Sequence, residues 1–493
     1  MDNRFGDMKR SRRKNVGGVD RISDLPESII HQIMSFLPAK EVARTSVLSK
    51  KWYHFKASYP VLELKGPFDD MNKFRQVVYD SLRHFSQNKL RLVAFCIEFF
   101  SDSLYSDLYS WIGLALENGV KRLDLCRECN SRCKFDSLPK HLFTLPRPLF
   151  SSNTLTVLNL TRCYLDQPLS IFNSFRELSF NYCFIKDPII WKDDDFPFLE
   201  RLVLCQCPNL TSVQISNLRR LHTIDVNFGS FLSQLVVASP SIQSFTISLF
   251  LSRHRWSEVV NIDGCDRLKF LFFKTSETIT DRELHSLLLK LTLLEVLFLS
   301  ICCQLNKIKI SSPCLKTLQI SDMKFGRLSI IEIATPNLKN FIYNGARKKP
   351  CRIKVAECCC NLETLVLCDY FATERTFHNL ISKFPLLENL WMVECDKLGR
   401  LKLLNPQLKR LHVAKCCNLK AVMVDGPNLI EFCYIGLNAP KITVPDFVKA
   451  SGGLRFEREP STYSSSRLGE LLGLKSEHLT SWVIGHVPGW REC

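Results

Sequence analysis

The sequence predicts an α/β protein in which three short helices precede a curved solenoid of stacked repeats with a parallel β-sheet on its concave face. Three observations predict this fold class. Apolar residues recur at positions one, four and six of a frame, successive frames start 20 to 26 residues apart, and the residues before position 60 show helical apolar spacing instead. The frames start at Leu155, Phe175, Leu199, Leu221, Ile242, Leu268, Leu294, Leu315, Leu338, Leu362, Leu387, Leu408 and Leu429.

The repeating frame predicts a short strand followed by a return segment. Side chains at positions four and six of a strand point to the same side, and a return segment with its own apolar side closes the coil. One copy cannot bury its leucines, whereas stacked copies can. A proline two places before position one is expected to end the return segment at Pro197, Pro240, Pro313, Pro336, Pro385, Pro406 and Pro427.

The composition is that of a folded protein with a large core. Of the 493 residues, 46% are hydrophobic and 23% are charged, and no run approaches 18 uncharged apolar residues. The first ten residues are polar and charged, so neither a secretory signal nor a membrane association is expected. The 22 cysteines are therefore expected to be reduced thiols, in the nucleus and/or the cytoplasm.

The net charge of +17 leaves several classes of partner open. Nucleic acid, acidic proteins and phosphorylated ligands all fit a basic chain. Residues 1–19 are expected to form a basic flexible tail that contains the run KRSRRK. This run fits either a nuclear import signal or a solvated tail without a receptor.

Residues 20–60 are expected to form three short helices. Pro26 suits the first turn of a helix, Pro38 should end that helix, and the third helix carries Trp52. Three helices in about 35 residues cannot enclose a sufficient core of their own. Their surplus apolar surface must therefore dock on something, either on the open end of the domain behind them or on another protein.

The run from Leu25-Pro26 to Lys51-Trp52 resembles an F-box, in particular the plant kind. The resemblance implies docking to a Skp-type adaptor, which connects the protein to a cullin as the substrate-choosing part of a ubiquitin ligase. By analogy, the adaptor interface and a small internal core would share Leu25, Pro26, Ile29, Ile33, Leu37, Pro38, Val42, Leu48 and Trp52.

The repeats resemble leucine-rich repeats, and the whole chain resembles plant F-box/leucine-rich-repeat proteins. The expected domains are the F-box at 20–60, a connecting region at 61–119, the leucine-rich repeats at 120–445, and a C-terminal cap and tail at 446–493. Leucine-rich repeats place Asn or Cys at position nine, where the side chain forms hydrogen bonds with the backbone at the bend. Cysteines occupy this position at Cys163, Cys183, Cys207, Cys302, Cys395 and Cys416.

Position five of each frame should face the open concave side of the solenoid. From Phe272 to Trp391 this position carries mostly large apolar residues, and exposed apolar clusters mark interaction sites. The alternative is that long loops or the C-terminal tail cover this patch. The expected substrate-binding residues are Phe270, Phe272, Phe298 and Trp391, with Arg201, Arg410 and His412 at the flanks for acidic groups.

No catalytic, cofactor or metal site is expected. The chain lacks the GxGxxG, GxxxxGK[ST], HExxH and GxSxG motifs, and the group Cys126, Cys129, Cys133 and His141 lacks the paired second half of a typical zinc site. The sequence therefore predicts a non-catalytic substrate-recognition subunit of a Skp-cullin-F-box ubiquitin ligase, with an unknown protein substrate. The alternative is a basic leucine-rich scaffold that binds nucleic acid or an acidic partner without ligase assembly.

Overall fold

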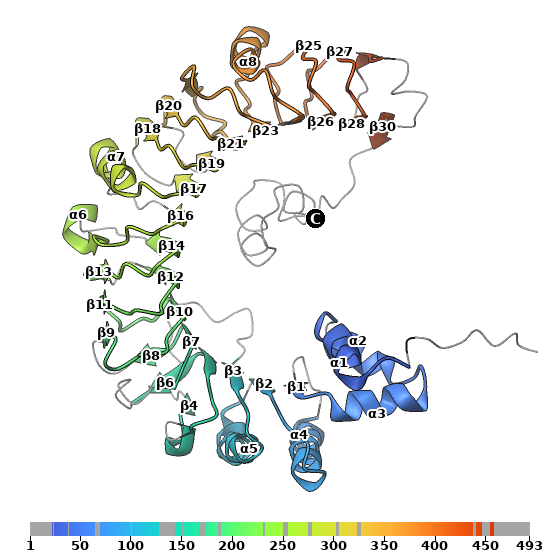
Figure 1. Cartoon of the computed structure of the whole chain (residues 1–493), viewed down its shortest axis with the longest axis vertical. Coiled ribbons are helices and arrows are strands. Elements are labelled where there is room, and N and C mark those ends of the chain that lie inside the picture. The colour runs from blue at the N-terminus through green and yellow to red at the C-terminus, as the bar shows by residue number, and fades with distance from the viewer. Residues whose placement is uncertain are drawn as a thin grey trace, which may run out of the picture.

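The computed structural model of the chain is an arc-shaped solenoid with three helices at its N-terminal end (Figure 1). The structure describes residues 22–457 except positions 23, 38 and 100 and the segments 65–69, 128–142, 150–151, 167–173, 186–188, 230–231, 250–254, 275–278, 302–304, 323–326, 437–439 and 446–453. The predicted fold class is confirmed.

The N-terminal helices are α1 (Glu27–Ser35), α2 (Ala39–Thr45) and α3 (Lys50–Ser58). Pro26 precedes the first turn of α1, and the side chain of Ser49 starts α3 by accepting a hydrogen bond from the Trp52 amide at 3.3 Å. The buried residues of this region are Ile30, Met34, Val42 and Trp52. They form a small core that is separate from the core of the solenoid.

The concave face of the arc is one parallel sheet of 17 strands in the described part of the chain. In spatial order the strands are β1 (Val61–Leu64), β2 (Ala94–Phe99), β3 (Arg122–Arg127), β5 (Val157–Thr161), β7 (Glu177–Asn181), β10 (Arg201–Cys205), β12 (Thr223–Phe228), β14 (Ser244–Leu249), β16 (Phe270–Lys274), β17 (Val296–Ile301), β19 (Thr317–Asp322), β21 (Asn340–Asn344), β23 (Thr364–Cys368), β24 (Asn389–Val393), β26 (Arg410–Ala414), β28 (Glu431–Ile435) and β30 (Leu454–Glu457). Each strand pairs with its neighbour at matching frame positions.

The convex side carries short parallel sheets and helices (Figure 1). The sheets are β4 (Phe143–Thr144), β6 (Cys163–Leu165) and β8 (Phe184–Ile185); β9 (Ile189–Lys192), β11 (Ser212–Ser216), β13 (Gln234–Ala238) and β15 (Val260–Asn261); β18 (Lys307–Ser311), β20 (Ile330–Ala334) and β22 (Arg352–Val355); and β25 (Arg400–Leu404), β27 (Ala421–Asp425) and β29 (Lys441–Thr443). The helices are α4 (Met71–Gln87), α5 (Tyr105–Glu117), α6 (Trp256–Val259), α7 (Asp281–Lys290) and α8 (Glu374–Ile381), with short 3₁₀ turns at Asp102–Leu104 and Arg147–Leu149.

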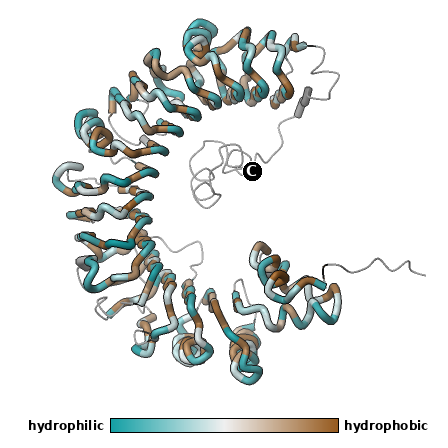
Figure 2. The backbone as a smooth tube through the Cα atoms, in the orientation of Figure 1, coloured by the Kyte–Doolittle hydropathy of each residue, from teal (hydrophilic) through white to brown (hydrophobic). Residues whose placement is uncertain are grey.

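A single apolar core runs through the solenoid between its concave and convex layers. It extends from Phe74 to Val444, and the residues at frame positions one, four and six are buried in every copy. Figure 2 shows hydrophobic residues recurring along successive turns of the coil. This arrangement is the one that the frame predicts, because each turn buries its leucines against the next turn.

The segment 61–119, expected to be a connecting region, supplies the first two strands of the concave sheet. β1 pairs with β2 and β2 pairs with β3, while α4 and α5 provide the convex side of these turns. The paired residues Val61 and Ala94 are 33 positions apart, and Ala94 and Arg122 are 28 apart. These turns are longer than the frame because their return segments are helices of 17 and 13 residues. The domain boundaries themselves remain predictions.

The position-nine cysteines that the structure describes form hydrogen bonds with the backbone at the bend, as expected. The Cys183 thiol donates to the Leu160 carbonyl at 3.4 Å, and the Cys207 thiol donates to the Phe180 carbonyl at 3.5 Å. Burial raises the pKa of Cys183 to about 12, so this thiol stays protonated. Cys302 lies outside the described residues.

The residue before these cysteines adopts a left-handed conformation that is uncommon for side chains with a Cβ. Examples are Arg162 and Tyr182, with φ of 59° and 53°. The amide of each donates to the carbonyl at position seven of the following turn, Arg162 to Asn181 at 2.9 Å and Tyr182 to Cys205 at 2.8 Å. This bend ends the strand while keeping the ladder between turns intact.

Candidate functional site

The first candidate surface is the outward side of α1. Leu25, Ile29, Ile33 and Leu37 follow one another at four-residue steps, and each is between 37% and 41% exposed. Ile29 and Ile33 lie on one face of α1, because residues four apart share a helix face, and Leu25 and Leu37 lie just before and just after the helix. We call these four residues the α1 stripe. On the other side of the helix, Ile30 is fully buried in the small core, so α1 is apolar on two sides.

The helical region exposes further apolar side chains outside the α1 stripe. Phe36 is 80% exposed and Val47 is 84% exposed, and Leu48 beside Val47 is also exposed. Sequence reasoning did not select Phe36 or Val47. Phe36 lies three residues after Ile33 and seven after Ile29, so the helical spacing was the signal that could have identified it.

The nine expected adaptor residues divide between surface and core. Val42 and Trp52 are buried, while Leu48, Pro26 and the α1 stripe are exposed, and Pro38 lies outside the described residues. The nine residues were expected to be shared between an interface and an internal core, and the assignment of the exposed ones to an adaptor interface stays a prediction. Adaptor binding itself remains a prediction.

Polar contacts hold α1 against α3 and so fix the α1 stripe in place. The His31 Nε2 atom lies 3.0 Å from the Phe55 carbonyl oxygen, and its ring packs edge-on against Tyr59 with centroids 5.6 Å apart. The Ser58 hydroxyl donates to the Glu27 carboxylate. These contacts join the two ends of the helical region without using the exposed apolar face.

The second candidate surface is the concave face at position five, and here one expectation is wrong. Phe272, Phe298 and Trp391 were expected to be exposed, but they are 7%, 2% and 6% exposed. Phe270 packs edge-on against Phe298 with ring centroids 5.6 Å apart. Position-five side chains of neighbouring strands stand in register about 4.8 Å apart, so large groups contact one another along the sheet.

The expected patch is also divided into two clusters, one around Trp391 and one around Phe298. Ile342, Val366 and Trp391 form one buried cluster, and the His412 ring stacks on Trp391 with centroids 3.8 Å apart and planes 6° apart. Trp391 lies four strands beyond Phe298, which is about 19 Å at the usual strand spacing.

Arg201 does not belong with the other two flanking residues. It lies on β10, nine strands before Arg410 on β26, which is about 43 Å at the usual strand spacing. Its electrostatic partner is Asp225 on the neighbouring strand. Burial raises the pKa of Asp225 to about 6, and the charge of Arg201 opposes this shift.

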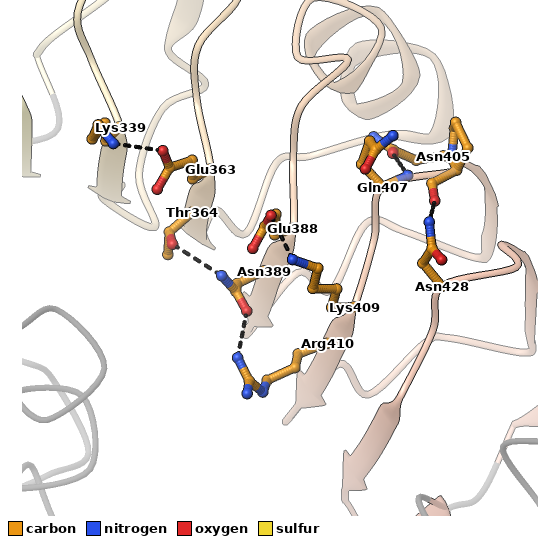
Figure 3. Close-up of polar contacts among 11 residues, drawn as sticks. Lys339, Glu363, Thr364, Glu388, Asn389, Asn405, Gln407, Lys409, Arg410 and Asn428 are labelled. Carbon is orange, nitrogen blue, oxygen red and sulfur yellow. Dashed lines mark hydrogen bonds and ion pairs between the residues drawn. The ribbon is translucent and has the colours of Figure 1, made fainter.

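Arg410 and His412 lie together and share a carboxylate. The Arg410 Nη1 atom donates to the Asn389 Oδ1 atom at 3.2 Å, in a row of side chains at position three (Figure 3). The Arg410 Nε and His412 Nε2 atoms both lie 3.9 Å from the Glu431 Oε2 atom. An acidic group of a ligand would therefore compete with Glu431 for these two side chains.

Ion pairs also cross-link the strands at position two. Lys339 pairs with Glu363 at 2.7 Å and Lys409 pairs with Glu388 at 2.7 Å, as Figure 3 shows. Each pair joins two neighbouring turns. At the surface such ion pairs contribute about 0–1 kcal/mol each to the free energy of unfolding. Their main effect is therefore on how charge is distributed over this face.

No group of three or more His, Cys, Asp and Glu side chains is arranged to hold a metal ion in the described part of the chain. Three members of the group considered for zinc, Cys129, Cys133 and His141, lie outside it. No described helix is both long enough and apolar enough to cross a membrane.

Fold and surfaces together define a class: a strand-based repeat protein whose helical N-terminal region presents an apolar face. Comparison with known proteins makes the assignment more specific. A family model described as the F-box domain matches residues 22–62, and a model described as the At1g61320/AtMIF1 LRR domain matches residues 246–357 and 349–468. The chain therefore contains an F-box domain and a plant leucine-rich-repeat domain, as the resemblance implied.

Several curated Arabidopsis thaliana proteins are similar to the chain. The F-box/FBD/LRR-repeat protein At4g26340 is 30% identical over 249 residues, which are 47% of this chain and 55% of the relative. The F-box/FBD/LRR-repeat protein At2g26030 is 28% identical over 273 residues, 54% of this chain and 57% of the relative. The putative F-box/LRR-repeat protein At3g18150 is 28% identical over 229 residues, 45% and 46% respectively. The chain spans about half the length of these relatives.

Proposed function

We propose that this protein is the substrate-recognition subunit of a Skp-cullin-F-box ubiquitin ligase. The observation that carries the proposal is the α1 stripe, an exposed apolar face on a helical region whose own core, among the described residues, consists of four buried hydrophobic side chains. Burying a large apolar side chain contributes about 1.5–3 kcal/mol, so a partner that covers the stripe gains a specific interface. In this proposal the partner is a Skp-type adaptor that connects the chain to a cullin.

In this proposal the chain positions the substrate and carries out no chemical step itself. α3 leads into β1 through Tyr59 and Pro60 only, and the Pro60 carbonyl accepts a hydrogen bond from the Val93 amide at 2.7 Å. A docked adaptor would therefore hold the solenoid in a defined direction. The ubiquitin-transferring enzyme belongs to the assembly, which acts in the nucleus and/or the cytoplasm.

Substrate capture is assigned to the concave face near the Trp391 cluster. There the Arg410 and His412 side chains both lie beside the carboxylate of Glu431, so an acidic group on a protein substrate would meet two side chains that can donate hydrogen bonds to it. Phe270, Phe272 and Phe298 form a second cluster, and Arg201 lies apart from both. The substrate-binding residues are thus proposed as Trp391, Arg410 and His412 first, with the phenylalanine cluster as a separate contact.

A binding assay with a purified Skp-type adaptor tests the proposal. The double variant Ile29→Glu, Ile33→Glu places two charges on the α1 stripe and is expected to weaken adaptor binding at least tenfold. Val77→Glu is the matched control, because Val77 is equally exposed at 41% but lies on α4. Adaptor binding that is absent in the unaltered protein, or equal in the stripe variant and the control, would overturn the proposal.

The net charge of +17 supports one alternative, a scaffold that binds nucleic acid. Phosphate contacts release counterions, so affinity for duplex DNA or RNA would fall steeply between 50 and 200 mM salt. A steep salt slope together with no adaptor binding would favour this alternative. Adaptor binding with weak, non-saturable nucleic-acid binding would exclude it.

A further inference from the structure

The convex sheet β18–β20–β22 ends differently on its two sides. At the β18 side, helix α7 closes the strand edge: the Asp281 carboxylate accepts hydrogen bonds from the Asn306 and Lys307 amides, both at 3.0 Å. The His285 Nδ1 atom lies 3.4 Å from the carbonyl oxygen of Lys309 on the same strand. At the β22 side, no strand within the described residues continues the sheet.

The hydrogen bonds of β22 show which backbone groups lie on its open edge. The Arg352 amide donates to the Ser329 carbonyl at 2.8 Å, and the Ala356 amide donates to the Ile333 carbonyl at 2.9 Å. Backbone groups of a parallel strand alternate between its two edges. The amides and carbonyls of Ile353 and Val355 therefore point away from β20, toward the open edge.

A cavity of about 680 Å³ lies along this open edge, between β22 and α8. Ile353 and Val355 line it from the strand, and Phe377 and Leu380 line it from the helix. Its volume is within the range of about 300–1,000 Å³ that is usual for ligand pockets. In this turn a helix replaces the next convex strand, which leaves a groove beside β22.

The rim of the groove is positively charged. Arg352, Arg375 and Lys383 line it and are exposed, and no ion pair to any of the three is found within the described residues. Lys354 also lines it and pairs with Glu332 at 3.3 Å. Among the described residues that line the groove, Asp369 is the one carboxylate, and it accepts a hydrogen bond from the Phe371 amide at 3.0 Å.

We infer that the β22–α8 groove binds an acidic peptide segment of another protein, which adds as an extended strand to the open edge of β22. Strand addition supplies main-chain hydrogen bonds, and alternate side chains supply specificity. The existing partner strand shows the fitting pattern: Ile331 stands beside Ile353, and Glu332 stands beside Lys354. A peptide that alternates acidic and apolar residues would repeat this pattern on the other edge.

This surface is independent of the proposed ligase function. The groove lies on the convex side of the solenoid, and neither the α1 stripe nor the Trp391 cluster contributes to it. A failure of adaptor binding would leave the inference standing, and a failure of peptide binding would leave the proposed function standing.

Fluorescence anisotropy with the full chain tests the inference. The probe is a labelled, acetylated and amidated hexapeptide, Glu-Ile-Glu-Val-Glu-Ile. Saturable binding is expected, with at least tenfold weaker binding when alternate amides of the peptide are N-methylated, because methylation removes the hydrogen bonds to the strand edge. The charge-reversed peptide Lys-Ile-Lys-Val-Lys-Ile is expected not to bind.

Two variants locate the binding on the protein. The triple variant Arg352→Glu, Arg375→Glu, Lys383→Glu is expected to weaken binding at least tenfold. Its matched control reverses three exposed charges around the neighbouring convex sheet, in Arg400→Glu, Lys402→Glu, Lys420→Glu.

Val355→Pro removes an outward amide without removing a bond to β20, and it is also expected to weaken binding at least tenfold. If Val355→Pro does not fold, as shown by a lost circular dichroism signal, the N-methylated peptide tests whether main-chain hydrogen bonds to β22 hold the peptide. Equal binding by the triple variant and its control would overturn the inference. So would equal binding of the N-methylated peptide, or displacement of the probe by millimolar inorganic phosphate, which would indicate a simple anion site.

Discussion

The N-terminal helices and the solenoid solve the problem of burying apolar surface in opposite ways. The solenoid closes one continuous core over most of its length, whereas the described part of the helical region encloses four buried hydrophobic residues and turns the α1 stripe outward. A segment of this size cannot bury enough surface to be stable alone. The solenoid is therefore stabilised by contacts within the chain, whereas the helices keep apolar surface available for a partner.

The largest effect that tests this contrast is expected inside the solenoid. Leu365→Ala removes a fully buried side chain at position four of its turn and should lower the free energy of unfolding by about 2–5 kcal/mol. Urea denaturation followed by circular dichroism measures it, with and without adaptor. Leu404→Ala is the control, since Leu404 is 60% exposed and its loss should change little. Equal effects of the two changes would contradict the continuous core.

A smaller loss is expected at the concave face. Trp391→Ala removes a side chain that is 6% exposed and stacks on His412, and it should cost about 1.5–3 kcal/mol. The same denaturation experiment measures this loss. An unchanged transition would mean that the position-five ladder contributes no packing and behaves as an open surface, like the α1 stripe.

The pH dependence of stability provides a third test, at Asp225. Its pKa is raised to about 6 in the folded chain, against about 3.9 for an unperturbed Asp. Between these values the folded state binds more protons than the unfolded state, so this group's contribution to stability is greatest below about pH 4 and declines until about pH 6. The change is on the order of 1–3 kcal/mol. Asp225→Asn should remove this part of the pH profile; a profile identical to that of the unaltered chain would contradict the burial of the carboxylate.

The smallest stability effect compares two neighbouring residues of α1. Ile29→Ala should change the free energy of unfolding by less than about 0.5 kcal/mol, because Ile29 is partly exposed. Ile30→Ala opens the small core and should increase hydrogen exchange throughout α1, α2 and α3. Exchange mass spectrometry of the free protein distinguishes the two variants. Equal exchange in both would mean that the two sides of α1 are not different.

Sequence reasoning predicted the repeats because their burial depends on a local pattern. Positions one, four and six are buried wherever the frame was laid, from Leu155 to Leu429. It failed at position five because the exposure of Phe298 or Trp391 depends on the size of side chains one turn away, which a single frame does not contain. It set β1 and β2 apart from the sheet because their helical return segments lengthen the turns.

The candidate surfaces were predictable to different degrees. The α1 stripe follows from helical spacing and from the F-box resemblance. The β22–α8 groove does not, because no pattern in the sequence shows that a convex strand is followed by α8 instead of another strand. Arg201 was grouped with Arg410 by its frame position, and only the strand order shows that nine turns separate them.

The position-nine cysteines give the solenoid a row of chemical reporters. In the described part of the chain their thiols are buried and bonded to backbone carbonyls, so an alkylating reagent should reach one only when its own turn opens. Cys358, Cys360 and Cys417 are exposed and are expected to react first, which provides an internal reference in the same chain. Timed alkylation therefore records, turn by turn, where the solenoid begins to fray and whether a bound partner at either end slows that fraying.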